Sequence, residues 1–153
     1  MPEIYRSAAS VLVLRPGAAD GYQLLLLHKP RKGDAWQLPQ GGVEQGEELV
    51  AAGLRELQEE AALTDIAVLG TSDVVYQYDF PQSFRRFRPD NVRGQQIRFL
   101  LAKTGREAKV TPDGTEIDGF TWVEVHELGT YIKRKAYAEM IEELFAEAMT
   151  LIR

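Results

Sequence analysis

The amino-acid sequence predicts an α/β protein of the α+β kind, and three observations lead to this class. Apolar runs at residues 7–14, 23–28 and 95–103 are bounded by turn residues, which is typical of buried strands. Two segments, 41–63 and 133–149, instead repeat their apolar residues with the period of a helix. Strands and helices do not alternate regularly along the chain, which argues against a doubly wound parallel sheet.

The intervening segments fit this scheme. Residues 15–22 (RPGAADGY) carry turn chemistry between the first two apolar runs, so those runs are predicted to form a hairpin. Residues 66–78 alternate apolar and polar side chains in part and predict a further strand. Residues 79–94 contain two prolines and four arginines and predict a long loop. A loop of that length in a compact domain is usually functional or disordered.

Length and composition limit the possible functions. At 153 residues the chain is expected to form one domain, 1–153, as a monomer or small homo-oligomer. It contains no cysteine, which excludes a thiolate metal site or nucleophile and is compatible with a cytoplasmic location. No apolar run approaches membrane-spanning length, so no membrane partner is expected. The net charge of −5 argues against binding to a DNA duplex, but not against a small anion held through a metal ion.

Three glutamates mark the candidate site. Glu56, Glu59 and Glu60 are spaced i, i+3, i+4 and therefore share one face of the predicted helix. A different face carries an apolar stripe, formed by Val50, Leu54, Leu57 and Ala61. Like charges packed in this way repel each other unless a cation lies between them. Oxygen ligands on one face suit Mg²⁺ or Mn²⁺, the ions that bridge phosphate oxygens.

The segment 41–63 resembles the Nudix box, G-x5-E-x7-R-E-U-x-E-E-x-G-U, in which U is a bulky aliphatic residue. Eight positions match in register: Gly41, Glu47, Arg55, Glu56, Leu57, Glu59, Glu60 and Leu63. Ala62 stands where the box has glycine. Alanine there either adopts a left-handed backbone at a cost of about 1 kcal/mol, or the helix continues further. A solvated acidic helix is the alternative interpretation, but it does not account for the glycine, the first glutamate and the arginine.

The resemblance implies the Nudix fold over roughly residues 5–149, an α/β/α sandwich with a mixed β-sheet. It also implies metal ligands at Glu56, Glu59 and Glu60, with the Gly41 carbonyl as a further ligand of Mg²⁺ or Mn²⁺. In the family a structural salt bridge pins the loop to the helix, and here it maps onto Glu47 and Arg55. Arg55 is also placed to neutralise the acidic cluster.

Three further segments resemble one branch of the family, the RNA pyrophosphohydrolases and asymmetrically cleaving dinucleoside polyphosphate hydrolases. They are WQLPQGG (36–42), GQQ (94–96) and IKRKAY (132–137). In that branch a glutamate in an E-x-D-G-aromatic segment is a metal ligand or base, which implies this role for Glu116. The lysine and tyrosine of its K-R-x-x-Y segment face the nucleotide and phosphates, which implies substrate binding by Lys133 and Tyr137. Positive charge at a helix N-terminus is electrostatically unusual and favours an anion nearby.

Other basic segments carry open alternatives. In the predicted long loop, Arg85 and Arg86 lie between aromatic residues and suit a phosphorylated, base-bearing substrate, although a solvated hairpin tip is the alternative. The basic loop 29–35 either touches phosphate or is simply solvated. His28, with no second histidine nearby, is expected to be structural or at the surface. Asp118 is expected to be structural.

These residues together predict a metal-dependent pyrophosphohydrolase that splits a phosphoanhydride with water. Glu56 is the first candidate for the catalytic base and Glu116 the second. The expected substrate is a nucleoside polyphosphate, either a dinucleoside polyphosphate or the 5′-triphosphate end of RNA. The alternatives are a Nudix hydrolase of another nucleotide (a nucleoside triphosphate, an oxidised nucleotide or a nucleotide sugar) and a non-catalytic nucleotide-binding Nudix module.

Overall fold

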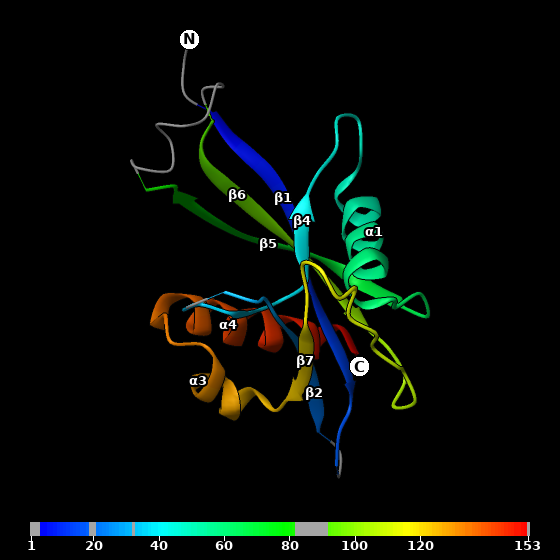
Figure 1. Cartoon of the computed structure of the whole chain (residues 1–153). Helices are drawn as coiled ribbons and strands as arrows, with labels where there is room; N and C mark the ends of the chain where they lie inside the picture. Colours follow the sequence, from blue (N-terminus) through cyan, green and yellow to red (C-terminus); the bar gives the residue numbers. More distant parts are fainter. Residues whose placement is uncertain (1–3, 19–20, 32, 82–91, 153) are drawn as a thin grey trace.

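The computed structural model describes residues 4–18, 21–31, 33–81 and 92–152, and shows a sheet with helices on both faces (Figure 1). Its elements in chain order are β1 (Ile4–Pro16), β2 (Tyr22–His28), β3 (Trp36–Gln37), β4 (Gln40–Gly42), α1 (Leu49–Ala61), β5 (Ala67–Asp79), β6 (Val92–Lys103), β7 (Gly119–Val123), the 3₁₀ helix η1 (Val125–Glu127), α3 (Leu128–Tyr131) and α4 (Lys135–Ile152). None of the helices in these described ranges is long and apolar enough to span a membrane.

The sheet is mixed and is centred on β1. Strand β1 runs parallel to β6, and β6 runs antiparallel to β5. On its other side β1 pairs antiparallel with β2, where Leu14 lies opposite Leu24, so the predicted hairpin is confirmed. The short β4 also pairs with β1, with Gly41 opposite Ala9, and β7 pairs with β2.

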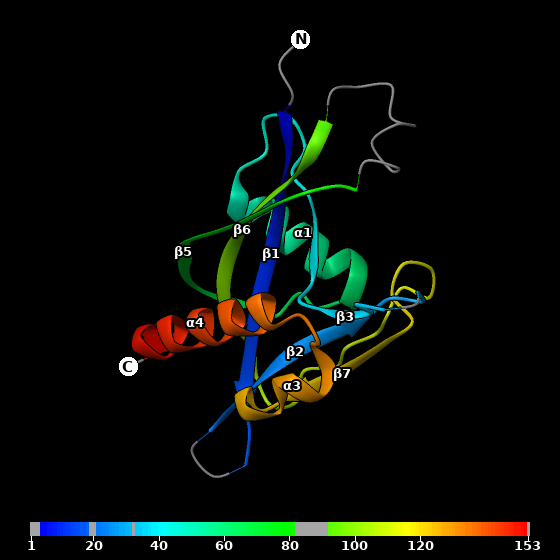
Figure 2. The same cartoon turned by 90° about the vertical axis from the view of Figure 1, so that its left-hand side faces the viewer.

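Alternate residues of β1 point into two separate apolar cores. Leu12 and Leu14 belong to the core covered by α4, whereas Val11 and Val13 belong to the core covered by α1. All four side chains are fully buried, and each such burial stabilises the fold by about 2 kcal/mol. Figure 2 shows α4 in front of the long strands and α1 behind them. The predicted α/β/α sandwich with a mixed sheet is therefore confirmed.

The structure corrects several predicted boundaries. Strand β1 is longer than the apolar run at 7–14, because its exposed end continues to pair with β6. Strands β5 and β6 extend to Asp79 and from Val92, so the ends of the predicted loop 79–94 are strand. Residues 82–91, with Arg85 and Arg86, lie outside the described residues. The last helix begins at Lys135 rather than at residue 133.

Candidate active site

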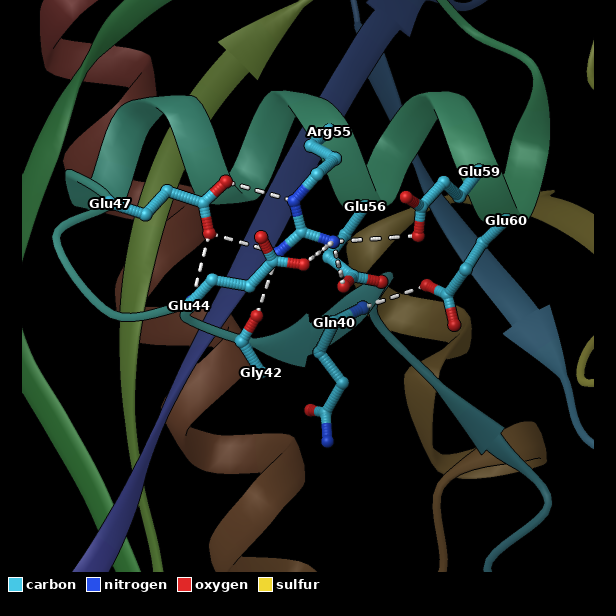
Figure 3. Close-up of polar contacts among 8 residues, drawn as sticks. All are labelled: Gln40, Gly42, Glu44, Glu47, Arg55, Glu56, Glu59 and Glu60. Carbon is cyan, nitrogen blue, oxygen red and sulfur yellow. Dashed lines mark hydrogen bonds and ion pairs between the residues drawn. The ribbon is translucent and has the colours of Figure 1, made fainter.

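The acidic residues of α1 lie on the side of the helix that faces β4 (Figure 3). Leu57 and Ala61 are fully buried on the opposite side, with Val50 and Leu54 packed against the same core, so the predicted apolar stripe is confirmed. Because β4 pairs with β1 next to the helix, its Gly41–Gly42 backbone lies against the carboxylates. The sheet thus holds one face of α1 and leaves the other to form a site.

Ala62 ends the helix in the left-handed conformation that the family pattern reserves for glycine. Its φ and ψ are 57° and 30°, and its N–H donates to the Gln58 carbonyl at 3.0 Å. The first of the two alternatives raised by the sequence therefore holds. The backbone keeps the turn, and alanine bears the steric cost of a Cβ in this region.

Replacing Ala62 by glycine is expected to stabilise the protein by about 1 kcal/mol, because glycine has no Cβ to clash in the left-handed region. Urea unfolding measures the change. Ala51→Gly is the matched control: it makes the same substitution at an exposed, right-handed position of α1 and should destabilise by about 1 kcal/mol. Equal destabilisation by both substitutions would contradict the strain assigned to Ala62.

Arg55 performs both of the roles that the sequence suggested for it. Its Nε and Nη2 donate to the two carboxylate oxygens of Glu47 at 2.8 and 2.9 Å, and Nη2 also donates to the Gly42 carbonyl at 2.9 Å. On the other side, Nη1 donates to Glu56 at 2.8 Å and to Glu59 at 3.5 Å. The Arg55 hydrogen bonds, with help from the Glu44 N–H, lower the pKa of Glu47 to about 2. Arg55 therefore ties the loop before α1 to the acidic face and also neutralises part of its charge.

The Glu60 carboxyl is buried, and only one of its two oxygens accepts a hydrogen bond from the described residues. Its relative exposure is 2 %, one oxygen accepts the Gln40 N–H at 3.1 Å, and the other oxygen has no hydrogen-bond partner among the described residues. Burial raises the pKa of Glu60 to about 8, and the charges of Glu56 and Glu116 push it in the same direction against the Gln40 bond and Lys29. A charged carboxylate at this position needs a cation beside it.

Gly41 and Glu56 fit closely against each other. A Cβ added to Gly41 would overlap the Glu56 carboxylate, so only glycine allows this approach. Burial raises the pKa of Glu56, the Arg55 hydrogen bond opposes that effect, and the charges of Glu59 and Glu116 add to it. Glu56 is thus held between the β4 backbone and Arg55, with other carboxylates nearby.

Glu116 reaches the same site from the loop before β7. The Asp113 carboxylate shapes this loop by accepting the N–H groups of Thr115 and Ile117 at 3.0 and 2.9 Å. Nδ1 of His28 lies 2.5 Å from Asp118 Oδ1, and the Asp118 N–H donates to the His28 carbonyl at 3.0 Å. This pair pins the Glu116 loop to the end of β2, in agreement with the structural roles expected for both residues.

The residues at this site fit a divalent cation in their chemistry. No three acidic or histidine side chains of the described ranges converge closely enough to hold one ion, and Arg55 engages Glu56 and Glu59. Yet Glu60 presents a buried oxygen without a hydrogen-bond partner in the described part of the chain, and Glu56 lies in the space left by Gly41. Hard oxygen donors with surplus negative charge suit Mg²⁺ or Mn²⁺.

A pocket adjoins the carboxylates through Gln40, whose side chain lines the pocket and whose N–H binds Glu60. Its lining includes Lys29, Arg31, Arg134, Tyr76, Tyr78 and Gln95, and contains no acidic residue among the described parts of the chain. The basic loop 29–35 therefore reaches the site. Sequence reasoning missed Arg134, Tyr76, Tyr78 and Gln95, although the period-two spacing of Tyr76 and Tyr78 on β5 places them on one face of the strand.

The structure changes the roles expected at the start of α4. Tyr137 is only 3 % exposed, its ring packs against Tyr76 and Arg134, and its hydroxyl accepts the Leu38 N–H at 3.0 Å. It lines the pocket as a supporting residue and offers no free ring face for stacking. Lys133 Nζ donates to the Gly129 carbonyl at 3.4 Å and does not line the pocket. The neighbouring Arg134 lines the pocket instead, and α4 begins two residues later than predicted.

The fold and this site define a class of protein: a sandwich domain with an acidic helix face beside a cationic pocket. A family model described as the NUDIX domain matches residues 4–144. An RNA pyrophosphohydrolase from Sulfurovum sp. (strain NBC37-1) is 31 % identical over 152 residues, which cover 95 % of this chain and 96 % of that protein. Another RNA pyrophosphohydrolase, from Halorhodospira halophila, is 40 % identical over 121 residues, which cover 72 % of this chain and 66 % of that protein.

Among solved structures, a binary complex of a C. elegans Ap4A hydrolase matches with a TM-score of 0.72 at 20 % identity, covering 95 % of this chain and 98 % of that one. At that identity the match establishes the shared fold. The chain belongs to the Nudix family, and its predicted class, a Nudix pyrophosphohydrolase, is confirmed.

Proposed function

We propose that this Nudix pyrophosphohydrolase acts on the 5′-triphosphate end of RNA, with dinucleoside polyphosphates as the second candidate substrate. The observation that carries the proposed chemistry is the buried Glu60 oxygen, which has no hydrogen-bond partner among the residues that the structure describes, beside a Glu56 carboxylate packed against Gly41. The sequence relatives named RNA pyrophosphohydrolase favour RNA. The Ap4A hydrolase match, which rests on fold alone, keeps the dinucleoside polyphosphates in second place.

In the proposed mechanism the ligands are Glu56, Glu59, Glu60, Glu116 and the Gly41 carbonyl. Mg²⁺ or Mn²⁺ bound there would neutralise charge on the phosphoanhydride and lower the pKa of an attacking water. Glu56 accepts the proton of that water, and Glu116 is the alternative base. Arg55 holds Glu56 in place and keeps the loop of Glu47 on the helix.

The pocket supplies the remaining charge that a polyanionic substrate requires. The protein is acidic overall, with a net charge of −5, and the carboxylate face adds local negative charge. Lys29, Arg31 and Arg134 line a pocket next to that face and are the cations proposed to bind phosphates beyond the metal ions. Tyr76 and Tyr78 are the aromatic residues of the same lining and are proposed to contact the nucleoside.

The two remaining alternatives are a hydrolase of another nucleotide and a non-catalytic nucleotide-binding module. Binding modules are expected to lose a carboxylate of the box, and this chain keeps Glu56, Glu59 and Glu60. A substrate panel tests the choice: triphosphorylated RNA, diadenosine polyphosphates and nucleoside triphosphates are each incubated with Mg²⁺, and the products are identified by mass. The largest kcat/KM is expected for triphosphorylated RNA. A larger value for a nucleoside triphosphate would move the assignment to the first alternative, and no turnover at all would support the second.

A further inference from the structure

The loop between β2 and β3 has an unusual backbone at Asp34. Its φ is 46°, and the preceding Gly33 has a φ of 67°, so two successive residues are left-handed. Aspartate tolerates this region better than most residues, because its short polar side chain bonds locally. The loop is closed by two backbone hydrogen bonds at 2.8 Å, from Lys29 to Ala35 and from Arg31 to Lys29. The loop therefore fixes the backbone at Asp34 and the direction of its carbonyl.

Two arginines from different parts of the chain meet at Asp34. Arg31 donates Nε and Nη2 to the Asp34 carbonyl at 3.0 and 2.5 Å. Arg134, just before α4, places Nε 3.5 Å from the Asp34 carboxylate and donates Nη1 to the Tyr76 hydroxyl at 3.3 Å. Both arginines line the cationic pocket. Asp34 thus contacts each of them through a different group and brings two like charges to the same pocket.

Gln37 also lines the pocket, beside Arg31. Gln37 is 6 % exposed, and its Oε1 accepts from Arg31 Nη2 at 3.4 Å. Because arginine can only donate, the atom facing it is the oxygen, so the Gln37 amide nitrogen points elsewhere. That nitrogen has no partner among the described residues. Two guanidinium groups and no acidic lining residue in the described chain fit an anion with several acceptor oxygens, such as a phosphate group.

We propose that Asp34 is a positioning residue that holds Arg31 and Arg134 as a two-armed clamp for a substrate phosphate not bound by the metal ions. The proposal rests on the proposed function, since it assigns the clamp to the same substrate. The Asp34–Arg134 pair is nearly half exposed on both sides and contributes little to stability, so its effect is on the orientation of Arg134. The carboxylate also offsets one of the two neighbouring positive charges while the pocket contains no ligand.

The substitution Asp34→Gly isolates the carboxylate, because glycine keeps the left-handed backbone and the carbonyl that binds Arg31. It is expected to raise the KM for triphosphorylated RNA about 5- to 10-fold with kcat within about twofold, and to weaken the binding of imidodiphosphate, a non-hydrolysable probe, by a similar factor in calorimetry without divalent cations. Asp34→Asn keeps an oxygen acceptor for Arg134 and is expected to stay within about twofold of the wild type. Thermal unfolding of each variant checks that the fold is intact.

A double-mutant cycle with Arg134→Gln completes the test. Once Arg134 is removed, Asp34→Gly should have no further effect on imidodiphosphate binding. The clamp is overturned if Asp34→Gly binds the probe as tightly as the wild type or more tightly, or if the two effects simply add. If the wild type binds the probe in an Asp34-dependent way but hydrolyses no substrate, the proposed function fails and the clamp stands. If it hydrolyses RNA and Asp34→Gly changes nothing, only the clamp fails.

Discussion

Glu59→Gln and Glu60→Gln are each expected to reduce turnover about 100-fold or more while leaving the fold intact. Both substitutions keep the side-chain shape and remove the charge that a divalent cation requires. The two residues differ in environment. The Glu59 side chain is 58 % exposed with Arg55 as a distant partner at 3.5 Å, whereas Glu60 is 2 % exposed. Glu60→Gln removes a carboxyl whose charged form is disfavoured by burial, so its thermal stability without metal should equal or exceed that of the wild type even as activity is lost.

A second measurement separates a loss of metal binding from a loss of substrate binding. Mn²⁺ that binds the folded wild type should raise its melting temperature. Both variants should show only a small part of that increase, because they bind Mn²⁺ more weakly. Glu48→Gln is the matched control, because Glu48 precedes α1, is exposed and makes no side-chain capping bond. It should retain both turnover and the Mn²⁺ response. Turnover of either Glu59→Gln or Glu60→Gln within about threefold of the wild type at saturating Mg²⁺ would refute the proposed ligand set.

Arg55→Gln is expected to lower the free energy of unfolding by about 2 kcal/mol in the absence of divalent cations. The substitution leaves Glu47, Glu56 and Glu59 without the guanidinium that now bonds to all three. Adding Mg²⁺ should recover part of the loss, because the cation supplies positive charge to the same carboxylates. Arg55→Lys is the control, because lysine retains the charge but cannot bridge both oxygens of Glu47. Its free energy of unfolding should lie between those of the wild type and Arg55→Gln. Chemical unfolding with and without Mg²⁺ measures these differences.

The effect of Arg55 should also depend on pH. The folded-state pKa of Glu47 is lowered to about 2, chiefly by its hydrogen bonds from Arg55. A group with a lowered folded pKa contributes stability above its unfolded value, near 4.3 for glutamate, and loses it as the pH falls toward the folded value. The stability difference between the wild type and Arg55→Gln should therefore be full at pH 6 and shrink below about pH 4. If the stability difference between the two proteins stays constant down to pH 3, the Glu47–Arg55 ion pair is not the main source of that difference.

The sequence was sufficient to predict features that depend on local spacing. The period of the apolar stripe on α1 fixed which face carries Glu56, Glu59 and Glu60, and the turn residues at 15–22 predicted the first hairpin. The boundaries of β3 and β4 were not predictable in this way, because strands of two and three residues around Pro39 have no measurable period. These strands exist because β4 pairs with the distant β1.

The same non-local pairing explains what the sequence missed in the site. Glu60 lies off the apolar stripe and was expected to be a metal ligand, but its burial beside β4 could not be predicted from the helical spacing. The predicted helix start at residue 133 lies two residues before the observed start at Lys135, and Arg134 rather than Lys133 lines the pocket. Tyr137, expected to bind substrate, is enclosed by Tyr76 and Leu38, neighbours that sequence spacing does not reveal.

The most direct test of the central claim is hydrolysis of triphosphorylated RNA in water enriched in ¹⁸O, with Mg²⁺ and then with excess chelator. Hydrolysis by an attacking water, aided by a cation on the acidic face of α1, predicts one ¹⁸O atom incorporated per cleavage into one product, measured by mass. It also predicts that turnover stops with the chelator and is lost in Glu59→Gln. Full turnover in excess chelator, or a phosphate trapped covalently on a side chain, would contradict it.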